Sequence, residues 1–231
     1  MSFKKFLQVA IVAELGIQFV SEYLFLPPLG IGGSAEWKNG TATVTASSSP
    51  IAVFCSVMGI VLFAVLMLTK APSGDASVPS WWRRVLSTVI DFYFVVMTLA
   101  GVSALLPLGL EALRTGHFVW AFQRHYAVPS DTALSGLVLF DMVLLVFYFV
   151  FPLTKGRQTV GCFVMRTKVT PPFGTEGCFT WRGAFRRIWC EFRAFARWRS
   201  LFKPERDVDG NTWYDVESGC RVASVDYTTS Q

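Results

Sequence analysis

The sequence predicts an all-α membrane protein with four transmembrane helices and one cytoplasmic amphipathic helix. Three observations lead to this prediction. Only 16% of the 231 residues are charged, whereas an average globular chain has about 25%. The mean hydropathy is +0.44. The apolar residues are gathered in long runs and do not recur at a helical or strand period. Together these features disfavour a soluble enzyme and a disordered chain.

Four apolar runs are long enough to cross a bilayer, for which a helix needs roughly 20 residues. They cover about 6–26, 50–69, 85–108 and 133–154. Backbone polar groups cannot be left bare in lipid, so we expect each run to be helical. The expected organisation has three parts: an N-terminal transmembrane hairpin (1–80), a two-span core (81–170) and a cytoplasmic tail (171–231).

The distribution of Lys and Arg predicts the orientation of the chain. Eighteen of the 21 basic residues lie before the first run, between the second and third, or after the fourth. Because basic residues favour the cytoplasmic side, we expect a multi-pass protein of a bacterial plasma membrane with both termini in the cytoplasm.

Two loops, about 28–49 and 109–132, are then expected to face outward. In the first loop, Thr41, Thr43 and Thr45 alternate with small apolar residues and predict a short strand. The second loop is rich in aromatic residues and predicts a short helix at the level of the lipid headgroups.

Ionisable side chains within the predicted spans are the most informative feature of the sequence. A carboxylate near the bilayer centre costs a few kcal/mol and usually faces protein or water. Glu14, Gln18 and Glu22 recur every four residues and therefore share one helix face. The full set of intramembrane candidates for function is Arg84, Asp91, Glu14, Gln18, Glu22 and Asp141.

Two interpretations of the carboxylates remain open. If their helix faces converge, they form a stepped column across the bilayer, which would suit relay of protons or cations. Alternatively, each carboxylate is paired or protonated for structural reasons. Arg84 and Asp91 lie about two turns apart on one face, so direct contact between them is not expected.

The segment from Arg83 to Asp91 resembles the RDD family of membrane proteins, in which an arginine opens a membrane helix and an aspartate follows within it. Arg84 (or Arg83) and Asp91 fit those roles. The glycine-punctuated 156–161 and the late segment 213–222 resemble later parts of the family pattern, with Tyr214 and Cys220 replacing its histidine and threonine. Phe92 follows Asp91 where a second aspartate is usual.

The resemblance implies architecture more than activity, since transport of unknown ligands is the usual suggestion for the family. It covers roughly 80–222, so the first two spans look like an added hairpin. Asp141 or Asp215 is a candidate for the family's second aspartate. On the residues themselves, 156–161 predicts a tight turn, with a phosphate cradle as the alternative. A strand is expected near 163–169, and 213–227 is expected either to add a short strand or to lie along the tail's own helix.

The segment 181–202 predicts an amphipathic helix on the inner membrane surface. Its apolar stripe follows helical spacing from Trp181 to Phe195, and aromatic residues beside arginines suit anionic lipid headgroups. The residues expected at this surface are Trp181, Trp189, Trp198, Arg182, Arg186, Arg187, Arg193 and Arg197.

The predicted function is transport of a proton, cation or small solute, and four spans are few for a transporter, so a homo-oligomer is expected. The alternative is a non-catalytic accessory or assembly subunit of a larger membrane complex. The sequence shows no catalytic constellation, and no enzyme activity, cofactor, metal site or nucleic-acid partner is expected. The expected partners are the bilayer, its anionic inner-leaflet lipids and other membrane subunits.

Overall fold

The computed structural model describes residues 2–24, 32–38, 41–71, 77–127, 132–171, 178–196 and 212–225, which are mostly helical. The chain divides into two compact units. The first unit consists of Met1–Val9, Phe63–Tyr93 and Val146–Gln231, and the second of Ala10–Leu62 and Phe94–Leu145. Each unit therefore combines segments from more than one of the three parts expected from the sequence.

All four apolar runs form helices. These are α1 (Phe3–Leu24), α2 (Pro50–Leu68), α3 (Trp81–Thr115) and α4 (Thr132–Thr154). Within the described part of the chain, α2 and α3 are long and apolar enough to cross a membrane. The described apolar part of α4, Met142–Thr154, is shorter. The helical prediction is thus confirmed for all four runs, and two of them qualify as candidate spans by length and composition.

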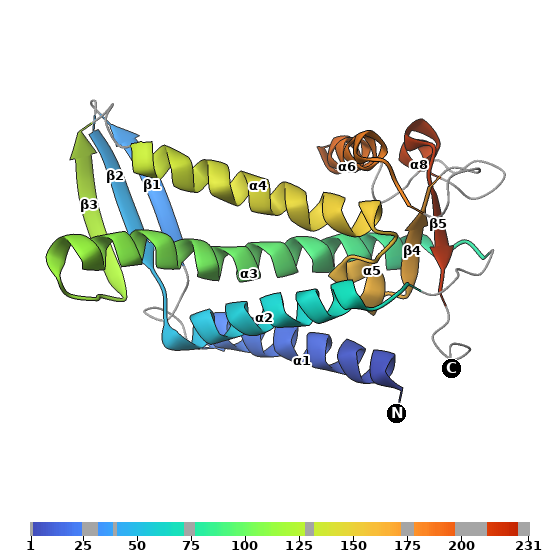
Figure 1. The fold of residues 1–231 in the computed structure, drawn as a ribbon, viewed down its shortest axis with the longest axis horizontal. Helices are drawn as coiled ribbons and strands as arrows, with labels where there is room; N and C mark the ends of the chain where they lie inside the picture. The colour runs from blue at the N-terminus through green and yellow to red at the C-terminus, as the bar shows by residue number, and fades with distance from the viewer. Residues whose placement is uncertain are drawn as a thin grey trace. The chain divides into compact units, whose positions relative to one another are not determined.

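The second unit contains a three-stranded antiparallel sheet, made of β1 (Gly32–Lys38), β2 (Thr41–Ser47) and β3 (Ala121–Ala127). Figure 1 shows the three strands side by side, with β2 in the centre. Val44 lies opposite Ala35 on one side and Arg124 on the other. The strand expected around Thr41–Thr45 is confirmed. The short helix expected in the second outer loop is wrong, because 121–127 pairs with β2.

Small residues allow α2 and α3 to approach each other closely in the second unit. A Cβ on Gly101 would overlap the Ser56 hydroxyl, which itself donates to the carbonyl of Ala52. Helix α2 begins with Pro50, and the Ser49 side chain accepts a hydrogen bond from the backbone N–H of Ala52 at 3.1 Å. Proline after a serine cap is a favourable start for a helix.

The first unit adds short elements that surround the ends of α3 and α4. They are α5 (Val160–Val164), β4 (Thr167–Thr170), α6 (Trp181–Ala196), α8 (Trp213–Ser218) and β5 (Arg221–Ser224). Strands β4 and β5 pair antiparallel, with Val169 opposite Val222. The buried apolar cluster contains Val150, Leu153, Phe179, Ala184 and Cys220.

These elements confirm part of the tail prediction. The strand expected as one alternative within 213–227 is present as β5, and the strand expected near 163–169 begins only at Thr167 because 160–164 is helical. Helix α6 occupies the start of the predicted 181–202 helix, of which 197–202 lie outside the described residues.

A turn between α5 and β4 is held by side chains from other parts of the first unit. Arg166 has a positive φ of 54°. The side chains of Gln8 and Gln158 donate to the carbonyls of Val164 and Thr167, each at 2.7 Å. Arg83 donates to the carbonyl of Met165. Buried backbone carbonyls need such partners, so these side chains fix α5 beside the start of α3.

Candidate functional site

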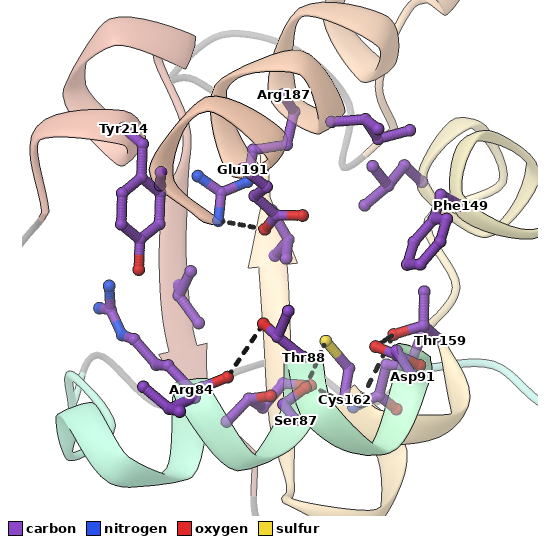
Figure 2. Close-up of a pocket in the computed structure, with 18 of the residues that line it drawn as sticks. Arg84, Ser87, Thr88, Asp91, Phe149, Thr159, Cys162, Arg187, Glu191 and Tyr214 are labelled. Atoms are coloured by element: carbon purple, nitrogen blue, oxygen red, sulfur yellow. Dashed lines mark hydrogen bonds and ion pairs between the residues drawn. The ribbon is translucent and has the colours of Figure 1, made fainter. Parts of the chain in front are cut away.

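Among the described residues of the first unit, two carboxylates are buried, and the first of them is Asp91. Its side chain is 5% exposed. One carboxylate oxygen, Oδ1, accepts hydrogen bonds from the Tyr148 hydroxyl and from the backbone N–H of Gly161. The other, Oδ2, accepts from the Thr159 hydroxyl at 2.6 Å (Figure 2). Both oxygens are therefore used, and Asp91 joins α3 to α4 and to the start of α5.

The sequence around α5 explains why its first turn meets Asp91. Thr159 is the N-cap of α5 and its hydroxyl accepts from the backbone N–H of Cys162 at 3.4 Å. The N–H groups of a first helical turn have no partner within the helix, so that of Gly161 is available to a carboxylate. It donates to Asp91 at 2.7 Å. Gly156, with φ of 61°, provides the preceding turn, as the sequence predicts.

Gly161 must lack a side chain, because a Cβ there would overlap the carbonyl oxygen of Ser87 and the Asp91 carboxylate. We expect Gly161→Ala to push α5 away from α3 and to lower the free energy of unfolding by about 1–3 kcal/mol. Thermal unfolding of the purified protein in detergent measures this effect. Gly109→Ala is the matched control, because no atom from another described part of the chain lies within 4 Å of a Cβ there. Equal losses of stability in the two variants would contradict the proposed close contact.

The second buried carboxylate is Asp215 in α8, which is fully buried. Its Oδ2 accepts from Arg84 of α3 and from the backbone N–H and hydroxyl of Thr212. Its Oδ1 accepts from Nη1 of Arg187 at 2.7 Å. Thr212 precedes α8 and Asp215 is the third residue of that helix, so the aspartate also caps its own first turn.

The charges around Asp215 decide its protonation. Burial alone would raise the pKa of the carboxyl group, but the guanidinium groups of Arg187 and Arg84 and the hydrogen bonds from Thr212 outweigh it. The pKa of Asp215 therefore lies below its ordinary value. The group is an anion at neutral pH, and it connects helices that are far apart in the sequence.

Arg187 does not lie at the surface expected from the sequence. Its side chain is 2% exposed, it donates from Nη2 to Glu191 at 2.7 Å, and it packs over the Tyr214 ring at 5.1 Å. Burial favours the neutral guanidine, but the carboxylates of Glu191 and Asp215 outweigh it and raise the pKa of Arg187. The prediction of Arg187 as a surface residue is therefore corrected: it belongs to the interior of the first unit.

Other tail residues predicted at a membrane surface do lie on the exposed side of α6. Trp181 and Trp189 are exposed, as are Arg182 and Arg186. Arg193 is partly exposed and forms an ion pair with Glu217 at 2.8 Å. Arg197 and Trp198 lie outside the described residues. The opposite side of α6, with Ala184 and Cys190, is buried.

In the second unit, the Glu14 side chain of α1 is buried, with 5% exposure. Neither of its carboxylate oxygens has a hydrogen-bond partner among the described residues. A Cβ atom placed on Gly59 of α2 would lie 3.4 Å from Glu14 Oε1 and 2.8 Å from the Thr98 hydroxyl oxygen of α3. The Thr98 hydroxyl and Gln18 Oε1 are also buried without a partner in the described part of the chain. Helices α1 and α3 thus bring unpaired oxygen atoms to one region, beside Gly59 of α2.

The structure describes only some of the side chains in the predicted column of carboxylates. Glu14 lies in the second unit and Asp91 in the first. The side chains of Glu22 and Asp141 lie outside the described set. Gln18 is buried one turn beyond Glu14, as their spacing predicts.

Sequence reasoning missed several residues of the site. Tyr148 and Thr98 look like ordinary polar residues within apolar helices, and nothing in the local sequence points to them. Thr159 lies inside the glycine-punctuated segment 156–161, but its hydrogen-bond partner Asp91 is 68 positions away. Arg84 and Asp215 both stand out in the sequence, but their pairing spans 131 positions. Of the two candidate aspartates, Asp141 and Asp215, it is Asp215 that pairs with Arg84.

Comparison with known proteins gives no relative: no family model, no curated protein and no solved structure matches the chain.

Proposed function

We propose that this protein is a multi-pass membrane protein that binds protons or monovalent cations at Glu14 and moves them across the bilayer. One observation carries the proposal. Among the described residues, neither carboxylate oxygen of the buried Glu14 has a hydrogen-bond partner, and the same holds for the side-chain oxygens of Thr98 and of Gln18, one turn further along α1. A buried polar group normally has a partner, and a buried charge without one costs several kcal/mol.

The chemistry of the unpaired atoms favours a positively charged or proton-bearing occupant. A carboxylate and an amide oxygen accept hydrogen bonds but donate none, and a threonine hydroxyl donates only one. A region made of oxygen atoms is matched by a proton on the carboxylate or by a hard cation, which prefers oxygen ligands. Proton relay and cation transport are the usual roles of such residues inside a membrane.

The helices around Glu14 are suited to a lipid environment. Of the helices that meet there, α2 and α3 are the candidate spans. Large apolar side chains on the outside of α2, such as Phe54, Val57 and Val61, are about half exposed. Exposed apolar surface of this extent is unusual on a water-soluble monomer and is matched by acyl chains. The resemblance of 80–222 to RDD proteins supports the same placement.

The first unit acts as the scaffold in this proposal, because both oxygens of Asp91 and of Asp215 are used within it. The exposed aromatic residues and arginines of α6 would lie on the inner leaflet surface. A single copy offers few helices for a pathway, so we propose that the protein works as a homo-oligomer.

Proteoliposomes that contain the purified protein test the proposal. With an imposed proton, Na⁺ or K⁺ gradient, we expect protein-dependent flux reported by an internal pH dye or an ion-selective dye. Glu14→Gln keeps the shape of the side chain but removes its charge and its titratable proton, and should reduce the flux at least tenfold. Glu217→Gln is the matched control, because Glu217 is a partly exposed carboxylate outside the second unit.

Folded wild-type protein that gives no flux would overturn the proposal and favour the accessory-subunit alternative. Equal flux through wild type and Glu14→Gln would remove Glu14 from the pathway. Unfolding temperatures of the two proteins establish that both are folded.

A further inference from the structure

The first unit contains a partly open cavity of about 80 Å³ between α3, α4, α5, α6, α8 and the β4–β5 strands. Figure 2 shows Arg84 and Tyr214 at one end and Asp91 with Thr159 at the other, with Arg187 and Glu191 above them. Three arginines line the cavity: Arg84, Arg157 and Arg187. The cavity is much smaller than the roughly 300–1,000 Å³ pockets that hold drug-sized ligands. It has room for a small group.

Each of the three arginines has N–H groups that donate to no described residue. Nε and Nη2 of Arg84, Nη1 of Arg157 and Nε of Arg187 are buried and have no hydrogen-bond partner among the described residues. Arg84 and Arg187 are themselves more than nine-tenths buried. A buried donor without an acceptor costs about 1–3 kcal/mol, and more when it is charged. Three such side chains around one cavity point to an acceptor-rich ligand.

The acceptors nearby are already engaged. Asp215 accepts one Nη1 group from each of Arg84 and Arg187, and Glu191 accepts Nη2 of Arg187. The oxygens of Asp91 accept from Tyr148, Thr159 and the Gly161 backbone. The three arginines are balanced in charge by the carboxylates of Asp91, Glu191 and Asp215. What remains unmatched is a set of guanidinium N–H donors, not a net positive charge.

Guanidinium groups match the oxygens of phosphate and carboxylate, which they bind through two N–H groups at once. A phosphate group offers acceptors in several directions, which suits donors converging from three different segments. The apolar wall that Phe149, Leu153 and Ile188 provide lowers the local dielectric and strengthens such bonds.

We propose that this cavity binds a phosphate group through Arg84, Arg157 and Arg187, presented either as free inorganic phosphate or as the phosphate of an anionic lipid headgroup. The proposal is independent of the cation site at Glu14, which lies in the other unit.

Two binding experiments on the full chain distinguish the sources. In the first, the detergent-purified protein is titrated with inorganic phosphate at constant ionic strength, with chloride replacing phosphate in the reference, and binding is measured by calorimetry. In the second, the protein in phosphatidylcholine nanodiscs is compared with nanodiscs that contain phosphatidic acid, and bound lipid is counted by native mass spectrometry.

Arg157→Gln is the informative variant, because Arg157 forms no ion pair with another described residue and its replacement leaves the Asp215 network intact. It should weaken phosphate or phosphatidic acid binding at least tenfold while the unfolding temperature without ligand stays within about 2 °C of wild type. Arg157→Lys should recover only part of the affinity, because an ammonium lacks the fork of donors. Arg114→Gln, an exposed arginine in the second unit, is the control and should bind as wild type does.

Saturable phosphate binding that depends on Arg157 supports a free phosphate ligand, and retention of phosphatidic acid that depends on Arg157 supports a lipid headgroup. Absence of binding in both experiments overturns the proposal. Equal weakening by Arg157→Gln and Arg114→Gln also overturns it, because binding would then follow net charge.

Discussion

Asp215→Asn is expected to lower the free energy of unfolding by about 3–5 kcal/mol, the largest effect of any single polar substitution in the first unit. The asparagine cannot accept with both side-chain atoms, so Arg84 and Arg187 lose the buried anion between them. A protein of ordinary stability has only about 5–15 kcal/mol in total. We therefore expect a large fall in unfolding temperature in detergent and a reduced yield of monodisperse protein.

Glu217→Gln is the matched control for Asp215→Asn. Glu217 also pairs with an arginine of α6, but both side chains of that pair are about 40% exposed. An exposed ion pair contributes about 1 kcal/mol or less, so this variant should melt within a few degrees of wild type. Equal destabilisation by the two substitutions would show that the buried network has no special role.

A double-mutant cycle separates the Arg84–Asp215 interaction from the separate costs of the two changes. Arg84→Gln with Asp215→Asn should cost less than the sum of the single variants, because no buried charge of that pair remains without a partner. An additive result would mean that the two side chains do not interact.

The same network gives a pH dependence of known sign. Because the pKa of Asp215 is lowered in the folded protein, its contribution is fully present above the ordinary aspartate pKa of 3.8. It is lost as the pH falls from that value towards the lower folded pKa. The stability of wild type should therefore fall more steeply on acidification below about pH 4 than that of Asp215→Asn.

Asp91→Ala is expected to destabilise the protein by about 2–4 kcal/mol, because it leaves three buried donors without their acceptor. Asp91→Asn should cost less, since one acceptor oxygen remains. Tyr148→Phe removes only one of the three donors to Asp91 and should cost least. Thermal unfolding of these variants in detergent gives this order, and an unchanged melting temperature in Asp91→Ala would contradict it.

Flux measurements distinguish the scaffold role of Asp91 from the transport role proposed for Glu14. The folded fraction of Asp91→Asn should retain flux in proteoliposomes, and Glu14→Gln should lose flux with little change in stability. The opposite result would assign the pathway to Asp91 and would make Glu14 a structural residue.

Local patterns in the sequence predict the helices well and the contacts between them poorly. Each apolar run forms a helix whose ends lie within a few residues of the prediction, except that α3 extends past both ends of its run. Strand β3 was not predicted, because a strand is defined by its pairing and its partner β2 lies about 80 positions earlier. Aromatic residues in a loop are compatible with a helix or a strand until that partner is known.

The position of Arg187 shows why a helical wheel was insufficient for α6. The wheel places Arg187 at the border of the apolar stripe, and in water the aromatic stripe would face the core. In the structure Trp181, Phe185 and Trp189 are exposed, and the buried side contains small residues with Arg187. The aromatic stripe of α6 is therefore not its buried side, so the partner of Arg187 could not be derived from the pattern.

For the candidate site too, the sequence identifies residues but not their contacts. The sequence identified Glu14, Gln18, Arg84 and Asp91, because charged or amide side chains in apolar runs are conspicuous. It could not show that the oxygens of Asp91 are satisfied and those of Glu14 are not. That distinction depends on donors from α4 and α5, which are present around Asp91 and absent among the described neighbours of Glu14.

The ion pair between Arg84 and Asp215 also constrains how the protein is made. The ribosome adds about 5–20 residues per second, and Asp215 follows Arg84 by 131 positions. Asp215 is therefore synthesised roughly ten seconds after Arg84, and α4 and α6 are synthesised in that interval. The buried network of the first unit can therefore form only after α8 has been synthesised, and a chain stopped before α8 would contain Arg84 and Arg187 without the Asp215 carboxylate between them.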